Sequence, residues 1–178
     1  MHQKNDDFKR IQTQTYQQNE KASESMRTSD IDMLLNRVDQ LLQANAPDQA
    51  LKLISNSKIK TPWLKNATAV CQLRLGNPQV AIEIYRSLLV NGGIFLRADA
   101  PVVFKVNFAV ALLLDKNLPG FYNALFDVKE EEHPSIPKLK AAVKNWRQQL
   151  TLWQKLQLIC GNHPHAPLEL GFAPGDLR

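Results

Sequence analysis

The sequence predicts an all-α fold of antiparallel helical hairpins, and three observations carry this prediction. Apolar residues recur at steps of three and four along most of the 178-residue chain, which is the spacing of one helix face, whereas strand alternation is rare. Proline suits a first helical turn, because the amide hydrogen that it lacks would be unpaired there. Loops of two to five residues separate the early helices, and such short loops force antiparallel pairs. Six of the ten prolines stand just ahead of an apolar run: Pro47, Pro62, Pro78, Pro101, Pro119 and Pro137.

The apolar spacing predicts seven helices in chain order, and residues typical of helix starts and ends agree with it. Three starts carry a side-chain oxygen for the free amides of the first turn, at Thr61, Asn77 and Asn117. Two ends carry glycine, at Gly76 and at Gly92 with its neighbour, where left-handed backbone is easily reached. The expected helices are 30–44, 47–56, 62–75, 78–91, 100–115, 118–128 and 136–159.

The last predicted helix, 136–159, carries one continuous apolar stripe. A stack of helical hairpins leaves its final apolar face uncovered, so a closing helix is needed. We therefore expect this helix to cap the stack, and a coiled-coil or dimer seam is the alternative that the stripe leaves open. Steps of 4, 3, 4 and 3 separate its members, which are Leu139, Val143, Trp146, Leu150 and Trp153.

An internal repeat is visible when the hairpins are aligned by their turns. In each hairpin a turn residue is followed five residues later by a packing position of the second helix, and four residues further on by another apolar or aromatic residue. The turn residues are Asn45, Gly76 and Lys116. The packing positions are Ala50, Ala81 and Phe121, and the residues four further on are Ile54, Tyr85 and Leu125.

In these residues the chain resembles a tetratricopeptide repeat protein, whose repeating unit places a small residue, a turn glycine, an alanine and an aromatic at such intervals. The middle unit matches best, with Ala69, Gly76, Ala81 and Tyr85. The first unit lacks the glycine and the aromatic, and the third has Phe121 in place of the small residue. The resemblance covers about residues 30–130. It implies a short right-handed solenoid of three hairpins, which the last helix extends to a domain of residues 30–160.

The two ends of the chain differ from this body. Residues 1–29 are rich in glutamine and poor in apolar residues, so we expect a flexible arm, with Ser29 and Asp32 as a capping-box-like start of the first hairpin. Residues 161–178 form a tail with three prolines and three glycines. Its apolar residues either lie in a groove of the same or another molecule or belong to a loosely packed tail: Leu168, Leu170 and Phe172.

The resemblance also implies a concave groove, lined by the first helix of each hairpin, that receives a partner peptide or helix. The best-known peptide mode of the family grips a terminal carboxylate with several lysines, and this sequence lacks matching lysines, so that specificity is not carried over. We predict a non-catalytic scaffold or adaptor that binds a protein or peptide. The candidate groove residues are Asp39, Gln43, Trp63, Asn66, Arg74 and Asn107.

A basic stripe on the last predicted helix gives an alternative function. Its four cations fall within about 80° of arc at about 100° per residue, and no acidic residue occurs between His133 and Leu168. Such a stripe can bind nucleic acid or another acidic surface, although a solvated helix face has the same pattern. The stripe consists of Lys140, Lys144, Arg147 and Lys155.

Enzyme chemistry has little support in the sequence. Cys160, His163 and His165 are a zinc-capable set of side chains, but no fourth ligand is evident, so we predict neither a metal nor another cofactor. The chain has no glycine-rich phosphate loop, nucleophile motif or paired-carboxylate pattern, and we predict that it is not an enzyme.

The composition bounds the location and the partners. The longest apolar run, from Phe108 to Leu114, has seven residues, while a membrane span needs about 20. We therefore expect no membrane partner. The first residues lack an apolar stretch after their charges, and two distant cysteines make no disulfide framework, so a reducing cytoplasm is predicted. A monomer and a homodimer both remain open.

Overall fold

The computed structural model of the protein describes residues 28–90, 96–126, 128, 133–160, 164, 166 and 168–178, and they confirm the all-α class. No strand occurs in these ranges, which hold only an isolated bridge between Val90 and Leu96. The first helix covers 28–43. The helices that follow are α2 (Pro47–Asn56), α3 (Pro62–Arg74), α4 (Pro78–Leu89), α5 (Val102–Leu114), α6 (Leu118–Phe126), α7 (Ser135–Gln149) and α8 (Leu152–Ile159).

The prolines mark helix starts as the sequence predicts. Three of them are the first residue of α2, α3 and α4, and the other three lie at or within the first turn of α5, α6 and α7. Two of the three expected caps are present, because Thr61 Oγ1 accepts from the amide of Leu64 and Asn117 Oδ1 from that of Gly120. The third is wrong: Asn77 makes no cap bond, and its side chain donates to Gln72 instead.

The three turns aligned in the sequence share one backbone geometry. Asn45, Gly76 and Lys116 are all left-handed, with φ of 54°, 78° and 62°. Each of them donates its amide to the carbonyl three residues back, and the next residue donates to the carbonyl five residues back. The packing positions that follow are fully buried: Ala50, Ala81 and Phe121.

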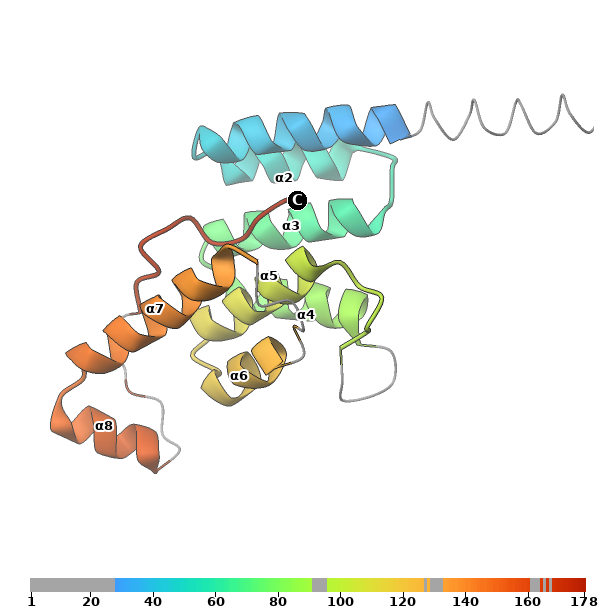
Figure 1. The fold of residues 1–178 in the computed structure, drawn as a ribbon. Coiled ribbons are helices and arrows are strands. Elements are labelled where there is room, and N and C mark those ends of the chain that lie inside the picture. The colour runs from blue at the N-terminus through green and yellow to red at the C-terminus, as the bar shows by residue number, and fades with distance from the viewer. Residues whose placement is uncertain are drawn as a thin grey trace, which may run out of the picture.

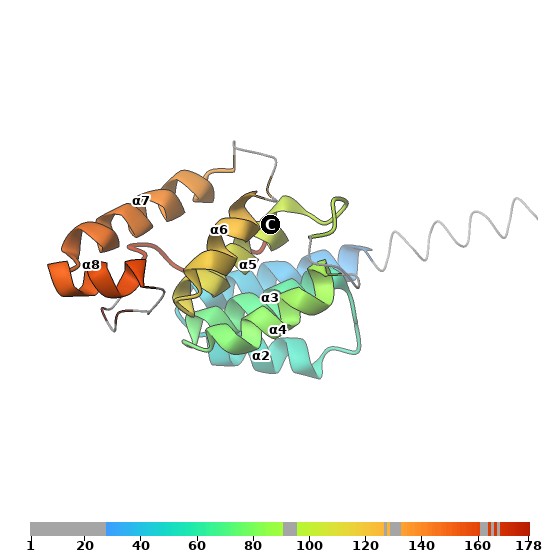
Figure 2. The same ribbon diagram turned by 90° about the horizontal axis from the view of Figure 1, so that it is seen from below.

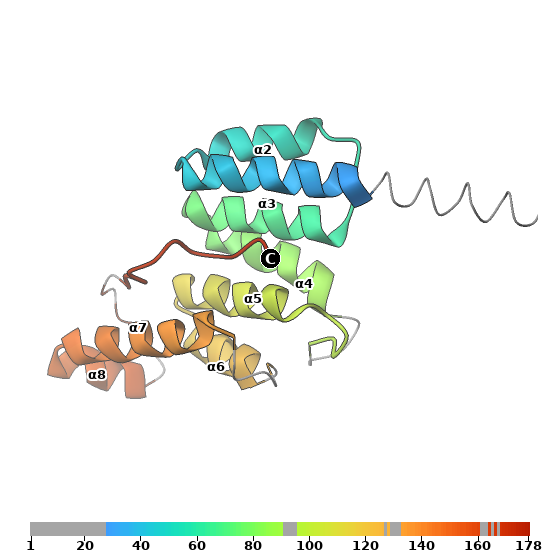
Figure 3. The ribbon, with the colours of Figure 1, turned by 45° about the horizontal axis from the view of Figure 1, so that its top comes forward.

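The helices pack in the order of the sequence. Helix α2 lies against α3, α3 against α4, α4 against α5 and α5 against α6, and Figures 1 and 3 show them side by side with the first helix. Helix α7 crosses beside α5 and α6, and α8 returns beneath it at the far end of the molecule (Figures 1 and 2). One apolar cluster joins the first helix, α2 and α3, and a larger one joins α3 to α7.

The expected single helix over 136–159 is wrong, because the chain breaks at Leu150 and Thr151. Leu150 is extended, with ψ 136°, and Thr151 begins α8 with a capping box in which Gln154 bonds back to the Thr151 amide. The apolar stripe ends at the same point. Its first four members, on α7 and at Leu150, are buried in the larger cluster, whereas Trp153 is 68% exposed.

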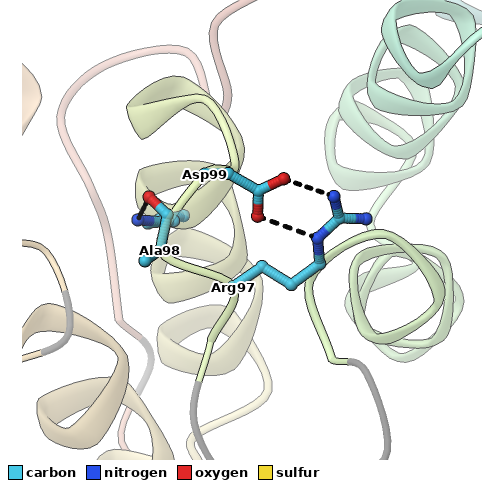
Figure 4. A network of polar contacts seen from close by, with 4 residues as sticks. Arg97, Ala98 and Asp99 are labelled. Carbon is cyan, nitrogen blue, oxygen red and sulfur yellow. Dashed lines mark hydrogen bonds and ion pairs between the residues drawn. The ribbon is translucent and has the colours of Figure 1, made fainter.

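Polar contacts close the loop in front of α5 (Figure 4). The Arg97 guanidinium donates twice to the Asp99 carboxylate, at 2.6 and 3.1 Å, and this pairing holds the pKa of Asp99 below and that of Arg97 above its usual range. Lys105, on α5, donates to the carbonyl of Ala98 at 3.2 Å. Because the ion pair is exposed, it fixes the loop rather than the fold.

At the other end, the first helix is already formed at Thr28, so the expected capping start at Ser29 is wrong. Asp32 instead pairs with Arg178, at 2.8 Å. The remainder of the predicted N-terminal arm lies outside the described residues. None of the described helices is both long and apolar enough to span a bilayer.

Candidate functional site

The last residues of the chain lie across α3 and α5, where the sequence predicts a partner-binding groove. Figure 3 shows this stretch ending between the two helices. We call residues 174–178 the C-terminal segment. Hydrogen bonds tie it to residues 41 to 146 positions earlier in the chain, so a distant part of the sequence occupies the predicted groove.

Two buried asparagines hold the backbone of this segment. Asn107 Nδ2 donates to the carbonyl of Asp176 at 2.7 Å, and Asn107 Oδ1 accepts from the Asp176 amide at 2.9 Å. Asn66 Nδ2 donates to the carbonyls of Asp176 and Leu177, at 3.3 and 3.2 Å. Both side chains are fully buried, so these bonds replace the water that an empty groove would supply.

Tyr85 fixes the orientation of the pair. Its hydroxyl donates to Asn66 Oδ1 at 2.8 Å, and Asn107 Nδ2 donates to the same oxygen at 3.0 Å. With its oxygen taken by two donors, Asn66 turns its amide nitrogen toward the C-terminal segment. Burial of the Tyr85 ring raises the pKa of its hydroxyl well above the usual range, which keeps it a donor.

The side chains of the C-terminal segment also make contacts. Leu177 is buried in the apolar cluster of the first helix, α2 and α3. The Asp176 carboxylate accepts from the hydroxyl of Ser135, at the start of α7, at 2.7 Å. Arg178 reaches Asp32 on the first helix. The segment therefore connects the two apolar clusters of the protein.

Gly175 is the residue that lets this backbone come close to α3. It is left-handed, with φ 82°, and a Cβ at its position would lie 3.0 Å from Val70 Cγ2. A larger residue would meet both the backbone strain and the packed side chain. The chain therefore lies directly on α3 at this point.

Arg74, at the end of α3, is the remaining contact. Its guanidinium donates to the carbonyl of Leu42 at 2.9 Å and to that of Gly175 at 3.4 Å. Its Nε is the one buried side-chain polar atom without a hydrogen-bond partner in the described part of the chain. The C-terminal segment thus satisfies this side chain incompletely.

For the other predicted groove residues the structure gives contacts other than hydrogen bonds to the C-terminal segment. Asp39 lines a small pocket beside Asp176 and Arg178, and Gln43 donates to Asp39 at 2.6 Å. Trp63 packs edge-to-face on Phe104, with ring centroids 4.9 Å apart, and lies against both apolar clusters, the smaller of which contains Leu177. Sequence reasoning missed Ser135 and Asp32 as contacts, because only the position of the tail makes them neighbours of the groove.

Leu168, Leu170 and Phe172 are the tail residues that the sequence places either in a groove or in a loosely packed tail. They are half-buried against the larger apolar cluster and precede the C-terminal segment in the sequence. Trp146 of α7 donates its ring N–H to the carbonyl of Ala166 at 3.4 Å in the same region. The tail therefore follows α7 back before it crosses α5 and α3.

The predicted basic stripe comes together in space, although the helix that was expected to carry it is broken. Lys140, Lys144 and Arg147 on α7 and Lys155 on α8 line one pocket of about 330 Å³, which we call the basic pocket. Aromatic residues of α6 complete it. The Arg147 guanidinium lies 5.5 Å from the ring centre of Tyr122, and Phe121 is buried below.

Of the zinc-capable set, the structure describes Cys160, whereas His163 and His165 lie outside the described residues. Cys160 is exposed and free, and Cys71 is buried and free. No group of three or more His, Cys, Asp or Glu in the described ranges is arranged to hold a metal ion.

Comparison with known proteins adds no assignment: no protein-family model, curated protein or solved structure matches this chain significantly.

Proposed function

We propose that the protein is a non-catalytic scaffold that binds an extended peptide in the groove on α3 and α5, and that its C-terminal segment occupies this groove until a partner displaces it. One observation carries the proposal: two buried amides, of Asn66 and Asn107, hold the backbone of Asp176. Backbone contacts do not depend on the side chain of the bound residue. Such a clamp therefore accepts another extended peptide, and pockets for the side chains select among them.

A right-handed tetratricopeptide-like solenoid is the architecture that we propose for the groove. It is supported by the common geometry of the three aligned turns and by the packing of successive helices. Each hairpin then presents its first helix to the same side, as the contacts of Asn66 on α3 and Asn107 on α5 with one peptide require.

The C-terminal segment indicates the chemistry of a partner peptide. The partner would present a glycine over Val70, a carboxylate near Ser135 and an apolar side chain in the Leu177 position. A partner with an additional acceptor near Arg74 Nε would satisfy the one atom that the C-terminal segment leaves unpaired. A hydrogen bond to a charged group of this kind contributes about 1.5–3 kcal/mol, enough to favour the partner.

Competition with the C-terminal segment sets the apparent affinity of the groove for a partner peptide. A segment tethered to its own groove acts at an effective concentration on the order of millimolar. A free peptide of equal intrinsic affinity therefore binds poorly to the intact chain and well once the tether is weakened.

Fluorescence anisotropy with a labelled peptide of residues 168–178 tests the proposal. The intact chain should bind it weakly, and the full-length variant Leu177→Ser, in which the apolar anchor is lost, should bind it at least about tenfold more tightly. Leu170→Ser is the matched control, because Leu170 is a half-buried tail residue outside the groove. Adding Asn107→Ala to Leu177→Ser should abolish the gain.

A folded Leu177→Ser chain that does not bind the peptide would rule out the groove, as would binding that is indifferent to Asn107→Ala. Circular dichroism of each variant establishes that it is folded. Capture of partners from the native cytoplasm, where we propose that the protein acts, then compares the intact chain with Leu177→Ser.

Binding of an acidic partner or nucleic acid remains the second candidate function. The specific observation in its favour is that Lys140, Lys144, Arg147 and Lys155 line one pocket.

A further inference from the structure

Helices α6 and α8 carry most of the large apolar side chains that are exposed on the described surface. Eight such side chains are exposed in the described ranges, and only two of them lie elsewhere: Met33 on the first helix and Val80 on α4. Scattered apolar residues are normal, but a local concentration marks a contact surface. The other six are Tyr122, Phe126, Leu152, Trp153, Leu156 and Ile159.

Helix α8 turns its apolar side away from the protein. Its exposed apolar residues fall within about 120° of arc, at about 100° per residue, and are 51–87% exposed. Gln154 and Leu158 lie on the opposite, half-buried side, and Gln157, also half-buried, lies at the edge about 40° from Trp153. A helix that faced only water would have the glutamines outside, so the outward side of α8 is built for an apolar environment.

The basic pocket lies at one edge of this apolar side. Lys155, which lines the pocket, is about 40° from Ile159 around α8. None of the four cations pairs with a carboxylate of the described residues. The sequence has no acidic residue between His133 and Leu168. A partner that matches both features would be apolar and would carry negative charge beside its apolar part.

We infer that this end of the molecule binds the surface of an anionic lipid bilayer, with the outer side of α8 at the acyl boundary and the basic pocket on lipid phosphates. A helix with tryptophan and leucine on one side and cations beside it lies in the plane of the interface. The expectation of no membrane partner rested on the lack of a spanning segment, and a surface contact needs none.

Two other occupants use less of this surface. A nucleic-acid strand would use the cations and the Tyr122 ring, but the aliphatic side chains of α8 would contribute nothing to it. A second copy of the chain would bring together two sets of cations that have no ionic partner among the described residues. Figures 1 and 2 show α8 at the outer end of the molecule, where a flat bilayer can reach it.

Co-sedimentation of the full chain with vesicles tests the inference. At low salt the chain should bind phosphatidylcholine vesicles that contain about one-third phosphatidylserine and should leave pure phosphatidylcholine vesicles unbound. Raising the salt should weaken binding at least about tenfold, because each cation near the surface contributes separately. The emission of Trp153 should shift to the blue on binding, and Trp153→Phe should bind without that shift.

Two pairs of variants locate the contact. Leu156→Ser with Ile159→Ser should reduce binding at least about tenfold, whereas Met33→Ser with Val80→Ser, equally exposed but elsewhere, should not. Lys144→Glu with Lys155→Glu should do the same, and Lys58→Glu with Lys60→Glu is the charge-matched control. All eight positions are exposed, so the variants should keep the circular dichroism of the parent.

Three results would overturn the inference. The first is no binding to phosphatidylserine vesicles at low salt. The second is binding that survives Leu156→Ser with Ile159→Ser, or that falls equally in the control variants. The third is an intact dimer that this double variant converts to monomers, which would make the face a self-interface. Tight binding of a single-stranded oligonucleotide by a chain that ignores vesicles would assign the pocket to nucleic acid instead.

Discussion

The groove and the basic pocket both gather polar side chains from several helices, but they differ in burial and in partners. Asn66 and Asn107 are fully buried, and their hydrogen bonds reach the C-terminal segment and Tyr85. The four cations of the basic pocket are exposed, and none has an ionic partner in the described chain. Buried polar groups must be paired in the folded state, whereas exposed charges are satisfied by water. Substitutions in the groove should therefore lower stability strongly, whereas substitutions in the pocket should change binding and cost about 1 kcal/mol of stability at most.

The largest effect is expected for Asn66→Leu. Leucine removes the acceptor of the Tyr85 hydroxyl and the donor to two carbonyls of the C-terminal segment, so several buried polar groups lose partners at once. We expect a loss of about 3–5 kcal/mol in the free energy of unfolding, measured with urea. Asn36→Ala, at an exposed position of the first helix, should cost less than about 0.5 kcal/mol. A similar cost for both would break the comparison.

A smaller loss in the free energy of unfolding is expected for alanine at two tail glycines, and its size distinguishes backbone strain from side-chain packing. Gly171 and Gly175 are both left-handed, with φ of 71° and 82°, but only Gly175 has a neighbour where a Cβ would stand. Alanine at Gly171 should cost about 1 kcal/mol from backbone strain. Alanine at Gly175 should cost about 2 kcal/mol, because Val70 must also move. Equal losses in urea unfolding would mean that the segment does not lie tightly on α3.

Alkaline pH should lower the free energy of unfolding through a buried thiol on α3. Burial raises the pKa of the Cys71 thiol on α3 to about 11, although Arg74 partly opposes this, and the ordinary value is 9.0. The raised pKa favours the folded state fully below pH 9, and this contribution is lost as the pH rises toward 11, since the unfolded chain releases its proton first. The free energy of unfolding should fall by about 1 kcal/mol between pH 8 and 10. Cys71→Ala should remove that part of the decrease.

Local signals explain what the sequence could predict about the fold. Proline at a first turn, Thr61 as a cap and the left-handed turn at Gly76 each depend on a few adjacent residues, and the structure shows all three. The continuous helix over 136–159 failed for the opposite reason. The apolar stripe continues in sequence past Thr151, but the capping box of Thr151 and Gln154 starts a new helix there.

The site depended on contacts that no local pattern shows. The resemblance to a repeat family placed Asn66, Arg74 and Asn107 on the inner side of successive hairpins, and these three hold the C-terminal segment. That residues 174–178 would fill the groove has no periodic signature, because a single extended stretch of a proline- and glycine-containing tail resembles any loop. The cation spacing predicted a basic stripe on one helix, whereas the structure places three of the cations on α7 and Lys155 on α8 around one pocket.

The smallest effect is expected at the contact between Arg147 and Tyr122. The guanidinium lies 5.5 Å from the ring centre, and both residues are exposed, so the pair should contribute about 0.5–1 kcal/mol. A double-mutant cycle with Arg147→Gln and Tyr122→Leu measures this coupling in urea unfolding. A coupling above about 2 kcal/mol would show that water is excluded from the pocket. In that case the pocket would resemble the groove, and the distinction between a stabilising and a purely binding site would fail.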